Sequence, residues 1–267
     1  MTARPFRLKT AFHEKLWGVT ALEPWFRPSK EKIGEVWFSN PGAEPLPLLV
    51  KMIFTSDRLS VQVHPGDTYA LAHEGSRGKT EMWYVLRAES GAQLAAGFRE
   101  PITRERAREA ALSGEIEHLL QWFTVSPGQV YFIPSGVVHA LGAGITLCEI
   151  QQNNPITYRL YDYGRPRELH LDKALDVARF ESHPGPTVPE GSLLFSCRHF
   201  TAERLEMSRC RYQPDAARIE VLLFLEGEGE IGADRFAAGE AWCVPPGTKL
   251  FTLSADTRVE ALRTFVP

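Results

Sequence analysis

The chain has 267 residues, of which 43% are hydrophobic, and its formal net charge is −3 from 30 basic and 33 acidic residues. This length allows one large domain or two moderate ones, each with a core of its own. The evenly balanced charge argues against nucleic acid and anionic membranes as partners. We expect a monomer or a homodimer.

The cysteines and the termini point to the cell interior. The four cysteines include no C-x-x-C pair, which argues against both a disulfide framework and a thiolate zinc site: Cys148, Cys197, Cys210 and Cys243. No stretch has the length of a membrane span, and no apolar segment follows the basic residues near Met1. The sequence predicts a cytoplasmic protein.

In chain order, most of the sequence consists of short apolar runs broken by Gly, Pro or Asp, which is typical of all-β folds. Strands are expected at 47–55, 59–64 and 80–86, followed by a helix that Thr103 caps and that ends at Gly114, and by a second helix at 115–122. Strands at 130–133 and 145–151, a helix at 171–178 and a strand at 220–225 complete the pattern. The helices at about 100–122 form a short insertion into β structure.

A segment rich in proline and glycine at 182–191 divides the chain, because such residues enter neither a helix nor a central strand. We expect one domain at 1–181, a linker at 182–191 and a second domain at 192–267. The two parts share a repeat of the form G-x5-P-x-G-x2-H: it runs from Gly128 to His139 in the first part, and from Gly239 to Leu250 in the second, where leucine replaces histidine. Upstream of each copy, the segment that begins at Glu81 can be aligned with the segment that begins at Glu220.

The G-x5-P-x-G-x2-H pattern resembles a motif of the cupin superfamily, whose members are small β-barrels that hold a metal inside. The resemblance implies an all-β fold with two cupin-like jelly-roll barrels and the short helical insertion. Only the first copy keeps its histidine, so the second barrel is expected to be degenerate and free of metal.

The first barrel contains a set of candidate metal ligands. The strand period of two puts Ser60, Gln62 and His64 on one face and apolar residues on the other, and the same period pairs Lys79 with Glu81. If these faces and His139 meet inside one barrel, two imidazoles, a carboxylate and an amide oxygen become available. This mixed nitrogen and oxygen set suits Zn²⁺ or a similar divalent ion, one per chain.

Several ordered blocks resemble the class I mannose-6-phosphate isomerases in their compact bacterial form. The blocks are L-S-V-Q-V-H-P-G-D at 59–67, G-K-T-E-M-W-Y at 78–84, I-P-S-G-V-V-H-A at 133–140 and E-I-Q-Q-N-N-P-I-T-Y-R-L-Y-D-Y-G at 149–164, with further similarity at 33–37 and 47–51. The resemblance implies a zinc-dependent interconversion of mannose 6-phosphate and fructose 6-phosphate through an enediol.

The same resemblance implies roles for individual residues. Gln62, His64, Glu81 and His139 fall on the family's zinc ligands. Arg159 falls on an active-site arginine, Ser60 and Lys79 on residues lining the sugar-phosphate site, and Glu149 on an active-site acid. Arg159, Lys79 and Glu149 are thus the candidate catalytic residues, and Ser60, Lys79 and Arg159 the candidate substrate contacts.

Some alternatives stay open at the level of sequence. The base could be Glu149 with a raised pKa, a neutral Lys79 or a water on the metal. Arg159 could instead be a structural arginine paired with Asp162. The whole chain could act on a related sugar phosphate, bind sugars without catalysis, or be a cupin dioxygenase that uses iron, although oxygen chemistry needs no phosphate-binding cations.

Overall fold

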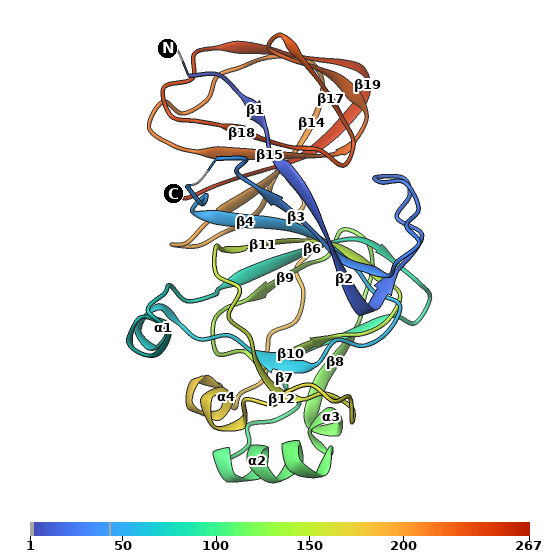
Figure 1. Ribbon diagram of the computed structural model, residues 1–267, viewed down its shortest axis with the longest axis vertical. Helices are drawn as coiled ribbons and strands as arrows, with labels where there is room; N and C mark the ends of the chain where they lie inside the picture. Colours follow the sequence, from blue (N-terminus) through green and yellow to red (C-terminus); the bar gives the residue numbers. More distant parts are fainter. Residues whose placement is uncertain (1–2, 43) are drawn as a thin grey trace.

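The computed structural model describes residues 3–42 and 44–267. Its strands form three sheets stacked along the long axis of the molecule, with most of the helices at one end (Figure 1). Within the described part of the chain, no helix is long and apolar enough to cross a membrane.

The upper sheet contains the C-terminal strands and one strand from the N-terminus (Figure 1). Its main path is β1 (Phe6–Arg7), β18 (Ala241–Val244), β15 (Glu220–Glu226), β19 (Phe251–Phe265), β14 (Thr201–Tyr212) and β13 (Leu193–Ser196). Strand β16 (Glu228–Ile231) pairs with β19 and with β17 (Asp234–Ala237). Strand β1 falls within the predicted first domain but pairs with β18, so the N-terminus ties the two parts of the chain together.

The middle and lower sheets are built from the preceding strands. The middle sheet runs in the order β2 (Lys9–Val19), β3 (Ile33–Ser39), β4 (Leu48–Phe54), β11 (Ile145–Gln152), β6 (Glu81–Ala88) and β9 (Val130–Ile133). The lower sheet runs in the order β12 (Tyr158–Tyr161), β5 (Val61–Val63), β10 (His139–Leu141), β7 (Gln93–Phe98) and β8 (Leu120–Thr124). The predicted strands are confirmed to within two residues at either end.

The alternation of side chains along each strand separates the cores. In β4, Val50 and Met52 pack against the upper sheet, while Ile53 faces the space between the middle and lower sheets. In β5, Val61 and Val63 pack toward the helices, as the period of two predicts, which leaves Gln62 facing the middle sheet. The space between the middle and lower sheets therefore receives polar side chains from both.

The helices cover the outer face of the lower sheet, except for α1 (Asp67–Glu74), which lies to one side (Figure 1). Helix α2 (Arg104–Ser113) begins after Thr103, whose side chain accepts from the amide of Arg106 as predicted. Helix α4 (Leu171–Val177) also agrees with its prediction. The mostly β fold with a short helical insertion is thus confirmed.

One helix prediction is wrong in its extent, and one helix was missed. Helix α3 covers only Ile116–Leu119, because residues from Leu120 onward pair with β7 as a strand. Helix α1 was not expected. It has an acid in its first turn, Asp67, and ends at Gly75 in the left-handed conformation, which are the ordinary signals of a short helix.

Candidate active site

The candidate metal ligands come from facing sheets. His139 begins β10 and lies opposite Gln62 of β5 in the lower sheet, while Glu81 begins β6 in the middle sheet. The turn before His139 is fixed to the strand end that carries His64, because the amide of Gly136 donates to the His64 carbonyl at 2.9 Å. Gly136 has a φ of 90°, which favours glycine at this place in the motif.

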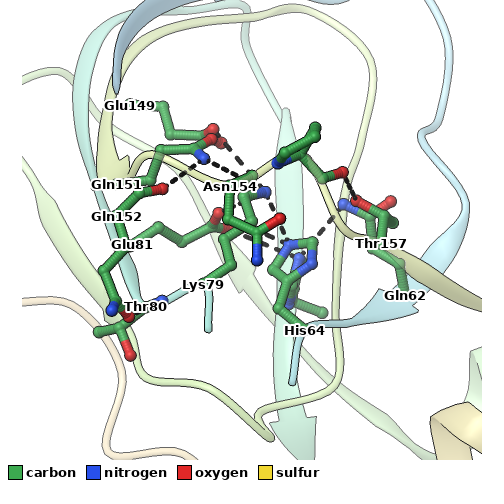
Figure 2. Close-up of polar contacts among 12 residues, drawn as sticks. Gln62, His64, Lys79, Thr80, Glu81, Glu149, Gln151, Gln152, Asn154 and Thr157 are labelled. Carbon is green, nitrogen blue, oxygen red and sulfur yellow. Dashed lines mark hydrogen bonds and ion pairs between the residues drawn. The ribbon is translucent and has the colours of Figure 1, made fainter. Parts of the chain in front are cut away.

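The two imidazoles converge on one carboxylate. His64 Nε2 lies 3.5 Å from Glu81 Oε2, and His139 Nε2 lies 3.6 Å from Glu81 Oε1. All three side chains are buried, and their ligand atoms lie within 4.8 Å of one another. Figure 2 shows Glu81 and Lys79 pointing toward His64, with Gln62 on the other side of the ring.

Gln62 completes the set of four. Its amide nitrogen lies 3.3 Å from His139 Nε2, and its oxygen accepts from Ser60 Oγ at 3.2 Å. A half-turn of the amide would exchange the two atoms and aim the oxygen at the histidines. The structure thus brings Gln62, His64, Glu81 and His139 together as a group, with Ser60 beside them.

Hydrogen bonds fix which nitrogen of each histidine faces the carboxylate. Nδ1 of His64 donates to the carbonyl of Ile156, and Nδ1 of His139 donates to the carbonyl of Val137, both at 2.9 Å. The lone pairs on Nε2 therefore point toward Glu81. Burial lowers the pKa of both imidazoles, that of His139 to about 3, so both are neutral near pH 7.

This group fits a divalent metal ion. Burial alone would raise the pKa of Glu81, but the Lys79 ammonium holds it well below its ordinary value, so the carboxylate is ionised. Neither of its oxygens has a hydrogen-bond donor of good geometry among the described residues. Two neutral imidazoles and an ionised carboxylate are the deprotonated donors that a borderline divalent ion requires.

Lys79 lies beside the ligand group. Its Nζ is 2.7 Å from Glu81 Oε2 and donates to His64 Nε2 at 2.9 Å. Burial opposes its charge, but Glu81 and Glu149 together raise the pKa of Lys79. The two carboxylates thus favour the charged, ammonium form of Lys79.

Glu149 lies on β11, with its carboxylate held between three groups. Oε1 is 2.9 Å from Lys51 Nζ and 3.9 Å from Lys79 Nζ, and Oε2 accepts from Trp83 Nε1 at 3.2 Å. Strand register explains the contacts, because Lys51 and Trp83 lie opposite Glu149 on the two neighbouring strands. The acid is thus fixed in position by residues from both sides.

Arg159 is not paired with Asp162, so that structural alternative is wrong. Asp162 accepts instead from Arg167 at 2.6 Å and forms an ion pair with Arg165 at 2.8 Å. Arg159 lies opposite Gln62 in the lower sheet, and its Nε is buried without a hydrogen-bond partner among the described residues. Burial and the nearby Arg167 lower the pKa of Arg159. Its guanidinium therefore retains the capacity to bind a ligand.

A cavity of about 360 Å³ joins these residues. Its lining includes the predicted Ser60, Gln62, Lys79, Glu149 and Arg159. It also includes residues to which the sequence assigned no role, namely Lys15, Trp17, Glu35, Trp37, Lys51, Trp83, Arg167 and His170.

Some of the cavity residues that sequence reasoning missed could have been found from the sequence pattern. Lys51 is the single charge in the buried strand L-L-V-K-M-I-F, and a buried charge requires a partner. Glu35 and Glu149 are equally isolated acids in apolar strands. Which acid meets which cation depends on strand pairing, which the sequence alone does not give.

Comparison with known proteins gives a consistent result. No family model matches the chain. A mannose-6-phosphate isomerase of Streptococcus mutans is 31% identical and covers 97% of this chain and 98% of its own length. A mannose-6-phosphate isomerase of Bacillus subtilis is 30% identical over 95% of this chain and 96% of its own length.

A solved structure agrees with these relatives. The crystal structure of a mannose 6-phosphate isomerase from Bacillus subtilis superposes with a TM-score of 0.84 at 25% identity, covering 97% of this chain and 99% of that one. The predicted fold class is confirmed by this match. The near-complete coverage at 31% identity also confirms the resemblance read from the sequence blocks, and the chain therefore belongs to the mannose-6-phosphate isomerase family.

Proposed function

We propose that this protein is a zinc-dependent isomerase that interconverts mannose 6-phosphate and fructose 6-phosphate. The names of the relatives support the substrate. The chemistry is supported above all by one observation: two cations, Lys79 and Arg159, line the cavity, and Lys79 also contacts the buried group of His64, Glu81 and His139. A sugar phosphate needs both kinds of group, because charge develops on its oxygens during reaction and its phosphate carries charge throughout.

The reaction moves a proton between C1 and C2 of the open-chain sugar through an enediol. A zinc ion held by Gln62, His64, Glu81 and His139 would act as a Lewis acid for the charge that develops on the sugar oxygens. The ammonium of Lys79 adds positive charge on the same side of the cavity. The planar guanidinium of Arg159 can bind a phosphate or an oxyanion through two parallel hydrogen bonds.

Glu149 is our proposed base. Its carboxylate lies on the cavity wall, and Lys51 and Trp83 fix its orientation. A carboxylate placed in this way can take the proton from one carbon and return it to the next. Lys79, being protonated, serves as a cation, and Ser60 offers a hydroxyl to the sugar phosphate.

We further propose one zinc ion per chain in a cytoplasmic enzyme. Residues 1–181 would form the catalytic domain, 192–267 a supporting domain without metal, and 182–191 the link between them. The segment 182–191 contains no helix or strand and only isolated bridges at Ser182 and Thr187, which supports its role as a connection.

The alternatives have less support. A dioxygenase would gain nothing from the charged cavity wall, and a sugar-binding protein without catalysis would not need Glu149 beside the ligand group. Action on a related sugar phosphate would use the same residues and is distinguished by assay alone.

The test is turnover of mannose 6-phosphate followed as fructose 6-phosphate, with glucose 6-phosphate and unphosphorylated mannose as comparison substrates. We expect turnover of mannose 6-phosphate, a far lower rate without the phosphate, loss of activity with chelator and recovery with Zn²⁺. A folded, zinc-loaded protein that fails to turn over mannose 6-phosphate would disprove the proposed function. Iron-dependent oxygen consumption would favour the dioxygenase.

A further inference from the structure

Acidic and basic side chains alternate along one wall of the cavity, and the last of them, Lys79, contacts the candidate metal ligand Glu81. Each charge lies within 4.0 Å of the next. The successive distances are 3.5 Å from Lys15 to Glu35, 3.9 Å from Glu35 to Lys51, 2.9 Å from Lys51 to Glu149, 3.9 Å from Glu149 to Lys79 and 2.7 Å from Lys79 to Glu81. Exposure falls along the series, from 33% of the Lys15 side chain to 1% of Glu81.

The outer half of this series is not required by the metal group or by the proposed contacts with substrate. Lys79, Glu81 and Glu149 have assigned roles, whereas Glu35 lies one step further out and reaches Glu149 only through Lys51. A carboxylate this buried is costly unless several donors compensate it. The question is what Glu35 does there.

Glu35 contacts both the Lys51 ammonium and the Trp37 indole that lies against that ammonium. Its Oε2 accepts from Trp37 Nε1 at 2.6 Å and lies 3.9 Å from Lys51 Nζ. The same ammonium lies 4.7 Å from the centroid of the Trp37 ring, within cation–π range. Lys51 is thus enclosed by Glu35, Trp37 and Glu149, and Glu35 orients the indole as well as attracting the cation.

The neighbouring strand supplies a counter-ion for Glu35. Glu14 and Val19 of β2 both lie opposite Ile33 of β3, so residues 15–18 form a bulge above that strand. Gly34 allows this bulge to lie close, because a Cβ at that position would come within 2.6 Å of Lys15 Cγ. The bulge brings the Lys15 ammonium to 3.5 Å from Glu35 Oε1 at the mouth of the cavity.

We propose that Glu35 is a positioning residue for the isomerase reaction, and that it acts by fixing Lys51 and Trp37 so that Lys51 holds the Glu149 carboxylate in its reactive orientation. Lys15 completes the arrangement as the counter-ion of Glu35. This inference rests on the proposed function, because it assigns Glu149 a step that Glu35 supports. Glu35 itself need not touch the substrate.

The test uses Glu35→Gln, which keeps the shape and an acceptor for Trp37 but removes the charge, and Glu35→Asp, which keeps the charge at shorter reach. The matched control is Glu14→Gln, an exposed acid on the paired strand β2. For Glu35→Gln we expect kcat to fall roughly tenfold or more, because a misplaced reacting group typically costs this much. KM, bound zinc and melting temperature should stay near the wild-type values, Glu35→Asp should recover part of kcat, and Glu14→Gln should match wild type.

Each other outcome has a defined meaning. A Glu35→Gln variant with kcat within twofold of wild type overturns the inference. So does a rise in KM with unchanged kcat, which would make Glu35 a substrate contact, or a parallel loss of melting temperature and rate, which would make it structural. If the wild-type protein itself does not turn over mannose 6-phosphate, the proposed function fails first and takes this inference with it.

Discussion

The sequence repeat matches Glu81 of a first unit, residues 81–139, with Glu220 of a second unit, residues 220–250, but the structure gives the two glutamates different neighbours. Glu81 begins β6 and Glu220 begins β15, and both are buried. Glu81 faces two imidazoles, at 3.5 and 3.6 Å. Glu220 accepts a hydrogen bond from the Tyr212 hydroxyl and another from the backbone amide of Asp215 at 3.1 Å.

The difference shows that a buried glutamate at the same position of the repeat can have a metal-binding or a structural environment. A buried carboxylate must be compensated, and the chain can do so with its own neutral donors or leave the oxygens to a cation. Burial and the adjacent Glu220 raise the pKa of Tyr212, so the hydroxyl remains a donor. In the second unit, Leu250 occupies the position that His139 has in the repeat. Leu250 is 47% exposed, whereas Glu220 is buried, so the side chain at this position is not enclosed with the acid.

The largest expected effect follows from removing one of the candidate metal ligands around Glu81. His139→Ala should abolish metal binding and with it the isomerase activity, because an imidazole that faces Glu81 is removed. Bound zinc measured by elemental analysis and turnover of mannose 6-phosphate check this. His118→Ala, an exposed histidine, serves as the control. Stoichiometric zinc in the His139 variant would mean that the ligand set is wrong.

Arg159 gives the next largest effect. Arg159→Lys should keep the fold and the zinc but lose roughly a hundredfold in kcat/KM, because an ammonium cannot reproduce the two-pronged guanidinium contact. Arg165→Lys is the matched control, since Arg165 pairs with Asp162 and does not line the cavity. An unchanged rate beside a lowered melting temperature in the Arg159 variant would assign that residue to the scaffold.

The buried histidines predict how stability depends on pH in the metal-free protein. Burial lowers their pKa values, that of His139 to about 3, whereas unfolded histidine titrates near 6.5. Between these values the unfolded chain binds more protons, so the free energy of unfolding should fall as pH decreases below about 6.5, by up to about 1.4 kcal/mol per pH unit for each histidine. Denaturant unfolding between pH 7 and 4 measures this, and His139→Gln should flatten the slope. A slope that the variant leaves unchanged would count against a buried, neutral His139.

Substitution of Glu220 is expected to give the smallest effect. It tests whether the glutamate of the second unit contributes to stability alone. Glu220→Gln should lower the free energy of unfolding by about 1–3 kcal/mol, because it weakens the hydrogen bonds to a buried acid. Zinc content and kcat should not change. Thermal unfolding and elemental analysis check both points, with the exposed Glu228→Gln as control. A loss of zinc in the Glu220 variant would show that the second unit contributes to metal binding.

Local patterns in the sequence were enough to predict much of this arrangement. The period of two along 59–64 placed Gln62 and His64 on one face, and the repeat motif placed His139 after a turn. The resemblance to the isomerase family then identified these residues, with Glu81, as the candidate ligands. The six strand ranges followed from apolar runs, and the Thr103 cap marked the start of α2.

The remainder depends on contacts between distant segments. Lys51 meets Glu149 across 98 residues because β4 and β11 pair, and Glu35 meets Lys51 because β3 lies on the other side of β4. The helix expected at 115–122 stopped early because strand pairing with β7 outweighed local preference at Leu120–Thr124. Arg159 could not be separated from Asp162 by sequence, since the competing Arg165 and Arg167 lie on the same loop.

Titration of the metal-free protein with Zn²⁺, with bound metal and turnover of mannose 6-phosphate followed together, tests the central claim most directly. We expect activity to rise in proportion to bound zinc and to reach its maximum at one equivalent per chain, both in the wild-type protein and in Leu250→His, which restores the missing histidine of the repeat without the other ligands. Full activity in the metal-free protein, or a second equivalent needed for maximal rate, would contradict the assignment of one catalytic zinc to Gln62, His64, Glu81 and His139.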